Sequence, residues 1–157
     1  MILRVEVVVD RALPIVRQRV LAYLRDETES GAATQAGDDQ MAVYRRAGVA
    51  GVTKKIQVHT LRPVDTEYRS VIPLRWTATG QGSGLFPTLD ANVELHAVDS
   101  ESTKIAVIGS YVPPLGRTGQ YLDRIALREV AHATLRRFVD RMAELAAADP
   151  AGAPVGS

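Results

Sequence analysis

Residues 85–112 read LFPTLDANVELHAVDSESTKIAVIGSYV, and apolar residues alternate with polar ones through much of this stretch. One parity is apolar: Leu89, Ala91, Val93 and Leu95. The other parity is polar: Asp90, Asn92, Glu94 and His96. Such alternation predicts a strand with one buried face. The polar turn at 99–102 and the alternating segment at 103–112 then predict an antiparallel hairpin.

The same reasoning extends the sheet in both directions. We expect strands at residues 2–9, 41–46, 52–61, 67–79, 85–98 and 103–112. Further inward-facing residues are Ile72, Leu74, Trp76, Ala78, Ile105, Val107, Gly109 and Tyr111. Short turns join the strands from residue 41 onward, which favours an antiparallel meander, because parallel strands need long crossovers. Residues 27–40 show no periodicity and predict a surface loop.

Two segments have helical periodicity. The first is predicted from Asp10, as the N-terminal cap, to Asp26, with Pro14 in the first turn. Its apolar face is Leu13, Val16, Val20 and Leu24. A longer helix is predicted over 118–147, with the apolar stripe Leu127, Ala131, Leu135, Phe138, Met142 and Leu145. We expect one domain over 1–147 and a disordered tail over 148–157.

Composition excludes several classes of function. The 157-residue chain has a net charge of +1 and 5% aromatic residues, which argues against a nucleic-acid-binding surface. The absence of cysteine excludes disulfides, thiolate catalysis and zinc–thiolate sites. Charges at Arg4 and Glu6 interrupt any signal peptide, and no apolar run approaches the ~20 residues of a membrane span. We expect a cytoplasmic protein, and its 16 arginines among 19 basic residues are typical of bacterial coding bias.

Three stretches carry a resemblance to a known family. They read LFPTLDA at 85–91, GSYVPPLG at 109–116, and DR through AHAT to Phe138 over 123–138. With the order of strand, helix, meander and long helix, they resemble the SRPBCC superfamily (START-like, helix-grip) in its polyketide cyclase and lipid-transport branch. Residues 27–40 depart from that family, because they lack its tryptophan-containing short helix.

The resemblance implies an α+β helix-grip fold, in which a curved, seven-stranded antiparallel sheet wraps around the long C-terminal helix and encloses a hydrophobic cavity. Family members carry lipids, hormones or polyketides, and some catalyse cyclisation or aromatisation. Candidate cavity-lining residues in this chain are Tyr68, Ile72, Leu74, Trp76, Leu89, Ala91, Val93, Val107, Tyr111, Arg124, Leu127, Arg128 and Ala131.

A ligand-sized space is plausible because several inward residues are small: Ala78, Ala91, Ala97 and Gly109. A plainly packed core is the alternative. Arg124 and Arg128, one helical turn apart, could bind a ligand carboxylate or phosphate. Alternatively, they extend to solvent or pair with neighbouring acids.

Three aromatic residues, Tyr68, Trp76 and Tyr111, share the inward parity. A phenol there could donate a proton to a developing enolate, and an ordinary aromatic core is the alternative. The three histidines lack any metal-ligand spacing, and Ser83 lacks the frame of a nucleophile elbow. We therefore expect neither a metal nor a cofactor.

The leading hypothesis is a carrier or sensor that binds a small hydrophobic or amphipathic ligand, without nucleic acid or integral membrane association. One alternative is an enzyme of the polyketide cyclase or aromatase type. Another is a protein-interaction module that uses the open sheet edge or the loop at 27–40, and a homodimer is left open.

Overall fold

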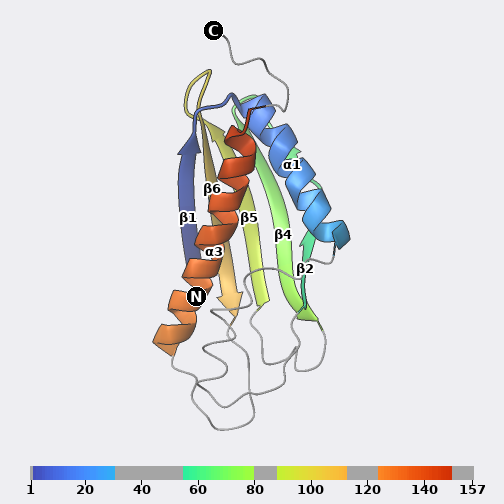
Figure 1. Ribbon diagram of the computed structural model, residues 1–157, viewed down its shortest axis with the longest axis vertical. Helices are drawn as coiled ribbons and strands as arrows, with labels where there is room; N and C mark the ends of the chain where they lie inside the picture. The colour runs from blue at the N-terminus through green and yellow to red at the C-terminus, as the bar shows by residue number, and fades with distance from the viewer. Residues whose placement is uncertain (1, 31–54, 80–87, 113–123, 150–157) are drawn as a thin grey trace.

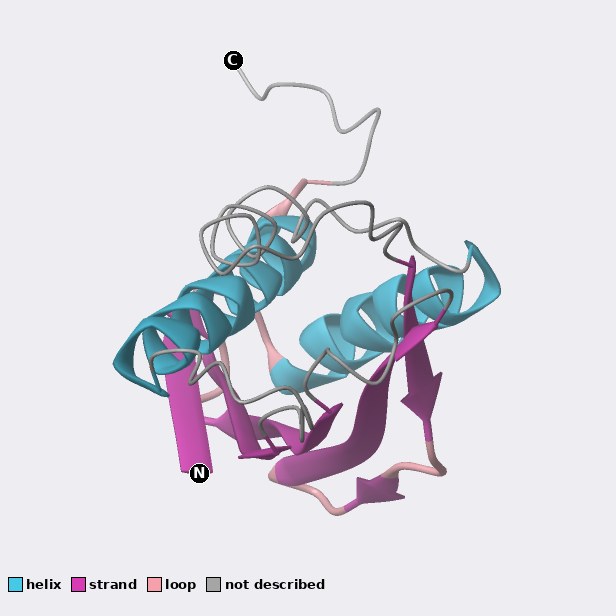
Figure 2. Cartoon of the chain, turned by 90° about the horizontal axis from the view of Figure 1, so that it is seen from below, coloured by secondary structure: helices cyan, strands magenta, loops and turns pink. Residues whose placement is uncertain are grey.

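The computed structural model describes residues 2–30, 55–79, 88–112 and 124–149. The elements in chain order are β1 (Ile2–Val9), α1 (Leu13–Ser30), β2 (Lys55–Thr60), β3 (Val64–Asp65), β4 (Arg69–Thr79), β5 (Thr88–Ala97), β6 (Thr103–Val112) and α3 (Arg124–Ala147). The described strands form one antiparallel sheet in the order β1-β6-β5-β4-β2, and β3 pairs with β4. Both helices lie on the same face of this curved sheet (Figures 1 and 2). The predicted α+β helix-grip architecture is confirmed.

The element bounds agree with the sequence prediction for two strands of the sheet. β1 and β6 begin and end at the predicted residues. α1 is longer than predicted, because Glu27 to Ser30 continue the helix although they lack an apolar face. The first glycine stands only at position 31, so nothing in these polar residues stops the helix earlier. Residues 41–46, most of the predicted loop and residues 118–123 lie outside the described residues.

The start of α1 corrects a second prediction. The backbone N–H groups of Ile15 and Val16 both donate to the carbonyl of Ala12, at 3.1 Å. Ala12 therefore occupies the cap position, and Asp10 lies two residues too early to serve as the N-cap. Pro14 does lie in the first turn, where its missing N–H leaves no hydrogen bond unmade.

The core lies between the sheet and the two helices. Its fully buried side chains are Val16, Val20 and Leu24 of α1, Ile72, Val93, Leu95, Ile105 and Val107 of the sheet, and Leu135, Val139 and Met142 of α3. The predicted helical faces and strand parities account for this set, except Val139, which adjoins the predicted stripe. The alternation read from the sequence therefore identifies which face of each element is buried.

A proline in the middle of β4 marks a gap beside that strand. β2 pairs with β4 as far as Leu74, and β3 resumes pairing at Val71. Pro73 lies between these two ladders, and its carbonyl accepts a hydrogen bond from the N–H of Leu61 at 2.8 Å. In an antiparallel strand the N–H of a residue points to the same side as its carbonyl, so the donor that proline lacks faces the gap.

Two arginines of the first helix region hold the end of the last helix. Arg19 donates to the carbonyl of Ala146 at 2.6 Å and to that of Ala148, while Arg11 pairs with Asp149 at 2.5 Å. Guanidinium groups satisfy carbonyls that the end of a helix leaves without partners. The first two residues of the predicted tail are thus anchored, Ala148 to Arg19 of α1 and Asp149 to Arg11 just before α1. Residues 150–157 lie outside the described residues.

Candidate functional site

The inner face of the sheet can be divided into rows by its register. At the end of the sheet where α3 begins, one row runs across β6, β5, β4 and β2: Tyr111, Leu89, Trp76 and Val58. The next row runs across β1, β6, β5 and β4: Leu3, Gly109, Ala91 and Leu74. The following row contains Val5, Val107, Val93 and Ile72. We call the first two rows the aromatic end of the core.

Accessibility within the core is uneven. Six buried hydrophobic side chains retain 7–9% of their surface: Trp76, Leu89, Ala91, Ala131, Phe138 and Ala143. Three of them belong to the aromatic end, and Ala131 and Phe138 come from the facing side of α3. By contrast, Ile72, Val93 and Val107 in the next row are completely buried. The residual accessible surface is therefore greater at the aromatic end and on α3 than in the next row of the sheet.

The aromatic rings join the sheet to both helices. The centroid of the Phe138 ring lies 5.9 Å from that of Trp76 and 5.8 Å from that of Tyr23, and both ring pairs are tilted. These separations fall in the range preferred by interacting aromatic rings. Phe138 of α3 thus bridges β4 and α1.

Gly109 does not leave the open space that its size predicts. A Cβ atom built on Gly109 would lie 2.8 Å from the Cβ of Ala91, 2.8 Å from the Cδ1 of Leu89 and 3.0 Å from the carbonyl oxygen of Asp90. Neighbouring side chains therefore already occupy the inner side of this glycine. The small residue serves close packing, and the interpretation that it contributes cavity volume is wrong at this position.

Tyr111 is the buried phenol of the aromatic end. Burial raises the pKa of Tyr111 from its ordinary value of 10.0 to about 12. The phenol is a weaker acid than free tyrosine, so transfer of its proton to a substrate becomes harder. The hydroxyl can still donate a hydrogen bond.

This pKa predicts how stability depends on alkaline pH. The stabilisation from the protonated phenol is fully present below pH 10.0, where tyrosine is protonated in the folded and unfolded chain alike. It is lost as the pH rises to about 12. We expect Tyr111→Phe to flatten the fall in melting temperature across this interval, and to remove the last phase of an ultraviolet tyrosine titration. A titration identical in both proteins would contradict the prediction.

The remaining candidates lie in different surroundings. Tyr68 is 67% exposed, so the prediction that it faces inward is wrong. It stands in a bend before β4, which begins only at Arg69, and the strand alternation does not extend to it. Arg128 is exposed on α3, as the alternative interpretation had it. The side chains of Arg124 and Leu127 lie outside the described ones, and the predicted internal cavity stays a prediction.

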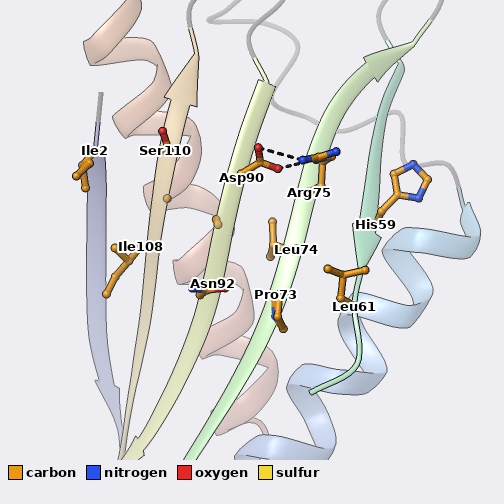
Figure 3. Close-up of a pocket in the computed structure, with 12 residues that line it drawn as sticks. Ile2, His59, Leu61, Pro73, Leu74, Arg75, Asp90, Asn92, Ile108 and Ser110 are labelled. Carbon is orange, nitrogen blue, oxygen red and sulfur yellow. Dashed lines mark hydrogen bonds and ion pairs between the residues drawn. The ribbon is translucent and has the colours of Figure 1, made fainter. Parts of the chain in front are cut away.

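The outer face of the sheet carries a groove that the sequence did not predict. The groove has a volume of about 780 Å³, and Figure 3 shows its lining residues on the strand face opposite the helices. Its apolar side chains are Ile2, Leu61, Pro73 and Ile108, and its polar ones are His59, Arg75, Asp90, Asn92 and Ser110. One signal in the sequence could have indicated this groove. Its four apolar residues occupy strand positions of the outward parity, where the alternation otherwise places polar residues.

Ion pairs stabilise this outer face between neighbouring strands. The Nε of Arg75 lies 2.6 Å from Asp90 across β4 and β5. Glu94 accepts from His96 at 2.9 Å and pairs with Arg69 at 3.0 Å. The hydrogen bond from His96, and then the charge of Arg69, lower the pKa of Glu94. These are cross-strand and same-strand surface pairs, each worth little singly.

Among the residues from 2 to 149 that the structure describes, no three histidine, cysteine or acidic side chains form a group able to hold a metal ion. None of the described helices is long and apolar enough to cross a bilayer.

No protein-family model and no curated protein matches this sequence. Among solved structures, a conserved protein from Geobacillus kaustophilus is similar with a TM-score of 0.59 and 12% identity, over 94% of this chain and 95% of that one. The Zhui aromatase/cyclase from Streptomyces sp. R1128 has a TM-score of 0.47 and 12% identity, over 93% of each chain. Norcoclaurine synthase from Thalictrum flavum has a TM-score of 0.45 and 11% identity, over 92% of this chain and 85% of that one. At these identities the likeness concerns the fold alone, and it is consistent with an SRPBCC-like fold.

Proposed function

We propose that this protein binds a small hydrophobic or amphipathic ligand between the aromatic end of the sheet and α3. The observation that carries the proposal is the uneven accessibility of the core. Trp76, Leu89 and Phe138 retain accessible surface, whereas the adjacent row of Ile72, Val93 and Val107 retains none. Apolar sites with few polar groups are the usual form of small-molecule pockets.

A carrier or sensor role fits the described chemistry better than catalysis. A cyclase needs polar groups directed at the reacting atoms. The polar candidates for the cavity are Tyr68, Tyr111, Arg124 and Arg128. Of these, Tyr68 and Arg128 are exposed, and Tyr111 has a raised pKa. The enzymatic alternative now depends on Tyr111 as a hydrogen-bond donor and on Arg124.

The single tryptophan provides a direct assay. Trp76 lies at the proposed site, so a ligand entering there should change its fluorescence. We expect saturable changes with oleate, an amphipathic acyl chain, or with emodin, a fused-ring phenol. Native mass spectrometry should detect the same complex at one ligand per chain. If neither probe changes the fluorescence or adds mass, the proposal fails.

A pair of matched variants locates the ligand. Ala131 and Ala143 are both buried alanines of α3. Ala131 lies two turns before Phe138 on the same helical face, whereas Ala143 lies nearer the end of the helix and on a different face. Ala131→Leu should weaken oleate binding by about tenfold, because added methylenes in a filled space cost 1–3 kcal/mol. Ala143→Leu should leave the affinity unchanged.

A third variant separates this site from the outer groove. Leu61 is an exposed residue of that groove and lies on the other face of the sheet. Leu61→Glu should not affect oleate binding at the inner site. If Leu61→Glu weakens binding and Ala131→Leu does not, the ligand occupies the outer groove and the proposed site is wrong.

A further inference from the structure

The first strand lies at one edge of the described sheet. β1 pairs with β6 through an unbroken register from Ile2↔Ser110 to Val9↔Thr103. Among the described strands, β6 is its single partner, and Figure 1 shows β1 at the end of the row of strands. The N–H and carbonyl groups that alternate with those bonded to β6 therefore point away from the sheet.

Of the features that usually prevent edge-to-edge association, this edge has only two charged residues, Arg4 and Glu6. The strand has eight residues, contains neither proline nor lysine, and has no bulge in its register. Two large apolar side chains on its outer face are strongly exposed: Ile2 at 76% and Val8 at 55%. A strand with these properties is a template for pairing with another strand.

The strand is complementary to itself when it is turned end for end. We propose that β1 pairs with β1 of a second copy, in antiparallel orientation, about a twofold axis at Val5. In this register Ile2 lies opposite the partner's Val8, and Leu3 lies opposite the partner's Val7. Arg4 lies opposite the partner's Glu6, and Glu6 lies opposite the partner's Arg4, so both charged contacts are attractive.

Charge selects this register over its neighbours. Only a change of the pairing register by two residues keeps inward side chains on the inner face. Such a change moves the twofold axis by one residue, to Arg4 or to Glu6. Shifting the axis to Arg4 sets arginine opposite arginine, and shifting it to Glu6 sets glutamate opposite glutamate, which is unfavourable. The axis at Val5 alone exchanges unlike charges and also covers both Ile2 and Val8.

Arg4 and Glu6, which would pair with the partner's Glu6 and Arg4 in the dimer, already form an ion pair within one chain. Within one chain, the Nη2 of Arg4 lies 2.8 Å from Glu6, and both side chains are about half exposed. The hydrogen bond from Arg4, and then the charge of Arg4, lower the pKa of Glu6. The dimer would form one sheet from β2 to the partner's β2, with all helices on the same side.

Charge-reversal variants test the interface in solution. Sedimentation of the unmodified chain over a concentration series should show a monomer–dimer equilibrium. Arg4→Glu and Glu6→Arg should each raise the dimer dissociation constant at least about tenfold, because like charges then oppose each other twice. Mixing these two variants should restore the dimer as a heterodimer. Arg141→Glu, at an exposed ion pair of α3, is the matched control and should change nothing.

Cysteine crosslinking tests the register itself. The chain has no cysteine, so every disulfide comes from an introduced residue. Arg4→Cys mixed with Glu6→Cys should form a crosslinked dimer on mild oxidation, because facing residues lie within disulfide reach. Either variant alone should crosslink far less. A monomer at every concentration, no recovery in the mixed charge variants, or equal crosslinking of the single cysteine variants would each overturn the proposal.

Discussion

Phe138→Ala is expected to lower the free energy of unfolding by about 3–5 kcal/mol, the largest loss among the substitutions considered. Phe138 packs against Trp76 of β4 and Tyr23 of α1, so its ring joins the sheet to both helices. Truncation removes both contacts and leaves a cavity that backbone elements on three sides cannot close. Urea denaturation followed by circular dichroism measures this change.

Tyr68→Ala is the matched control for this truncation. Tyr68 is an aromatic residue whose side chain is exposed, so its removal should change stability by no more than about 0.5 kcal/mol. Equal losses for Phe138→Ala and Tyr68→Ala would contradict the burial of Phe138 and the exposure of Tyr68. A loss below ~1 kcal/mol for Phe138→Ala would mean that the core can collapse around the missing ring.

Gly109→Ala is expected to destabilise the protein by about 1–3 kcal/mol, although alanine normally suits a strand at least as well as glycine. The new methyl group would meet the Cβ of Ala91 and the carbonyl of Asp90. Neither atom belongs to a flexible side chain, so the strands themselves must move apart. Thermal and chemical denaturation both report the loss.

A second substitution separates this overlap from other effects. Ala91 is the register partner of Gly109, so Ala91→Gly removes the methyl group that the new side chain meets. We expect the double variant to recover part of the stability lost by Gly109→Ala. Strictly additive losses in this double-mutant cycle would show that the two positions do not interact.

The sequence predicts the buried face of each element well, for a local physical reason. Leu89 to Leu95 alternate in a strand and Val16 to Leu24 repeat in a helix, so their spacing alone determines the side that faces the core. Tyr68 shares the parity of Trp76 but lies in a bend before β4, where parity has no meaning. Parity therefore fails where the extended backbone ends.

Features formed by segments that are distant in the chain could not be predicted from the sequence. Arg19 holds Ala146 and Ala148, more than a hundred positions away, and no periodicity indicates such a contact. The outer groove is lined by Ile2 of β1 and by Leu61, which follows β2, and these strands lie at the two ends of the strand order. Local periodicity does not reveal that order. The small size of Gly109 predicts cavity volume beside it, yet the positions of the neighbouring side chains determine whether that volume is empty.

The pairing of β1 with β6 also affects the order of events during synthesis. Ile2 finds its partner at Ser110, so the first strand leaves the ribosome long before its ladder can form. At 5–20 residues per second, that delay is about 5–20 s. During this time a valine-rich segment would be open to aggregation, and Arg4 and Glu6 are the charges that protect it. The nascent strand thus depends on two surface charges until β6 has been synthesised.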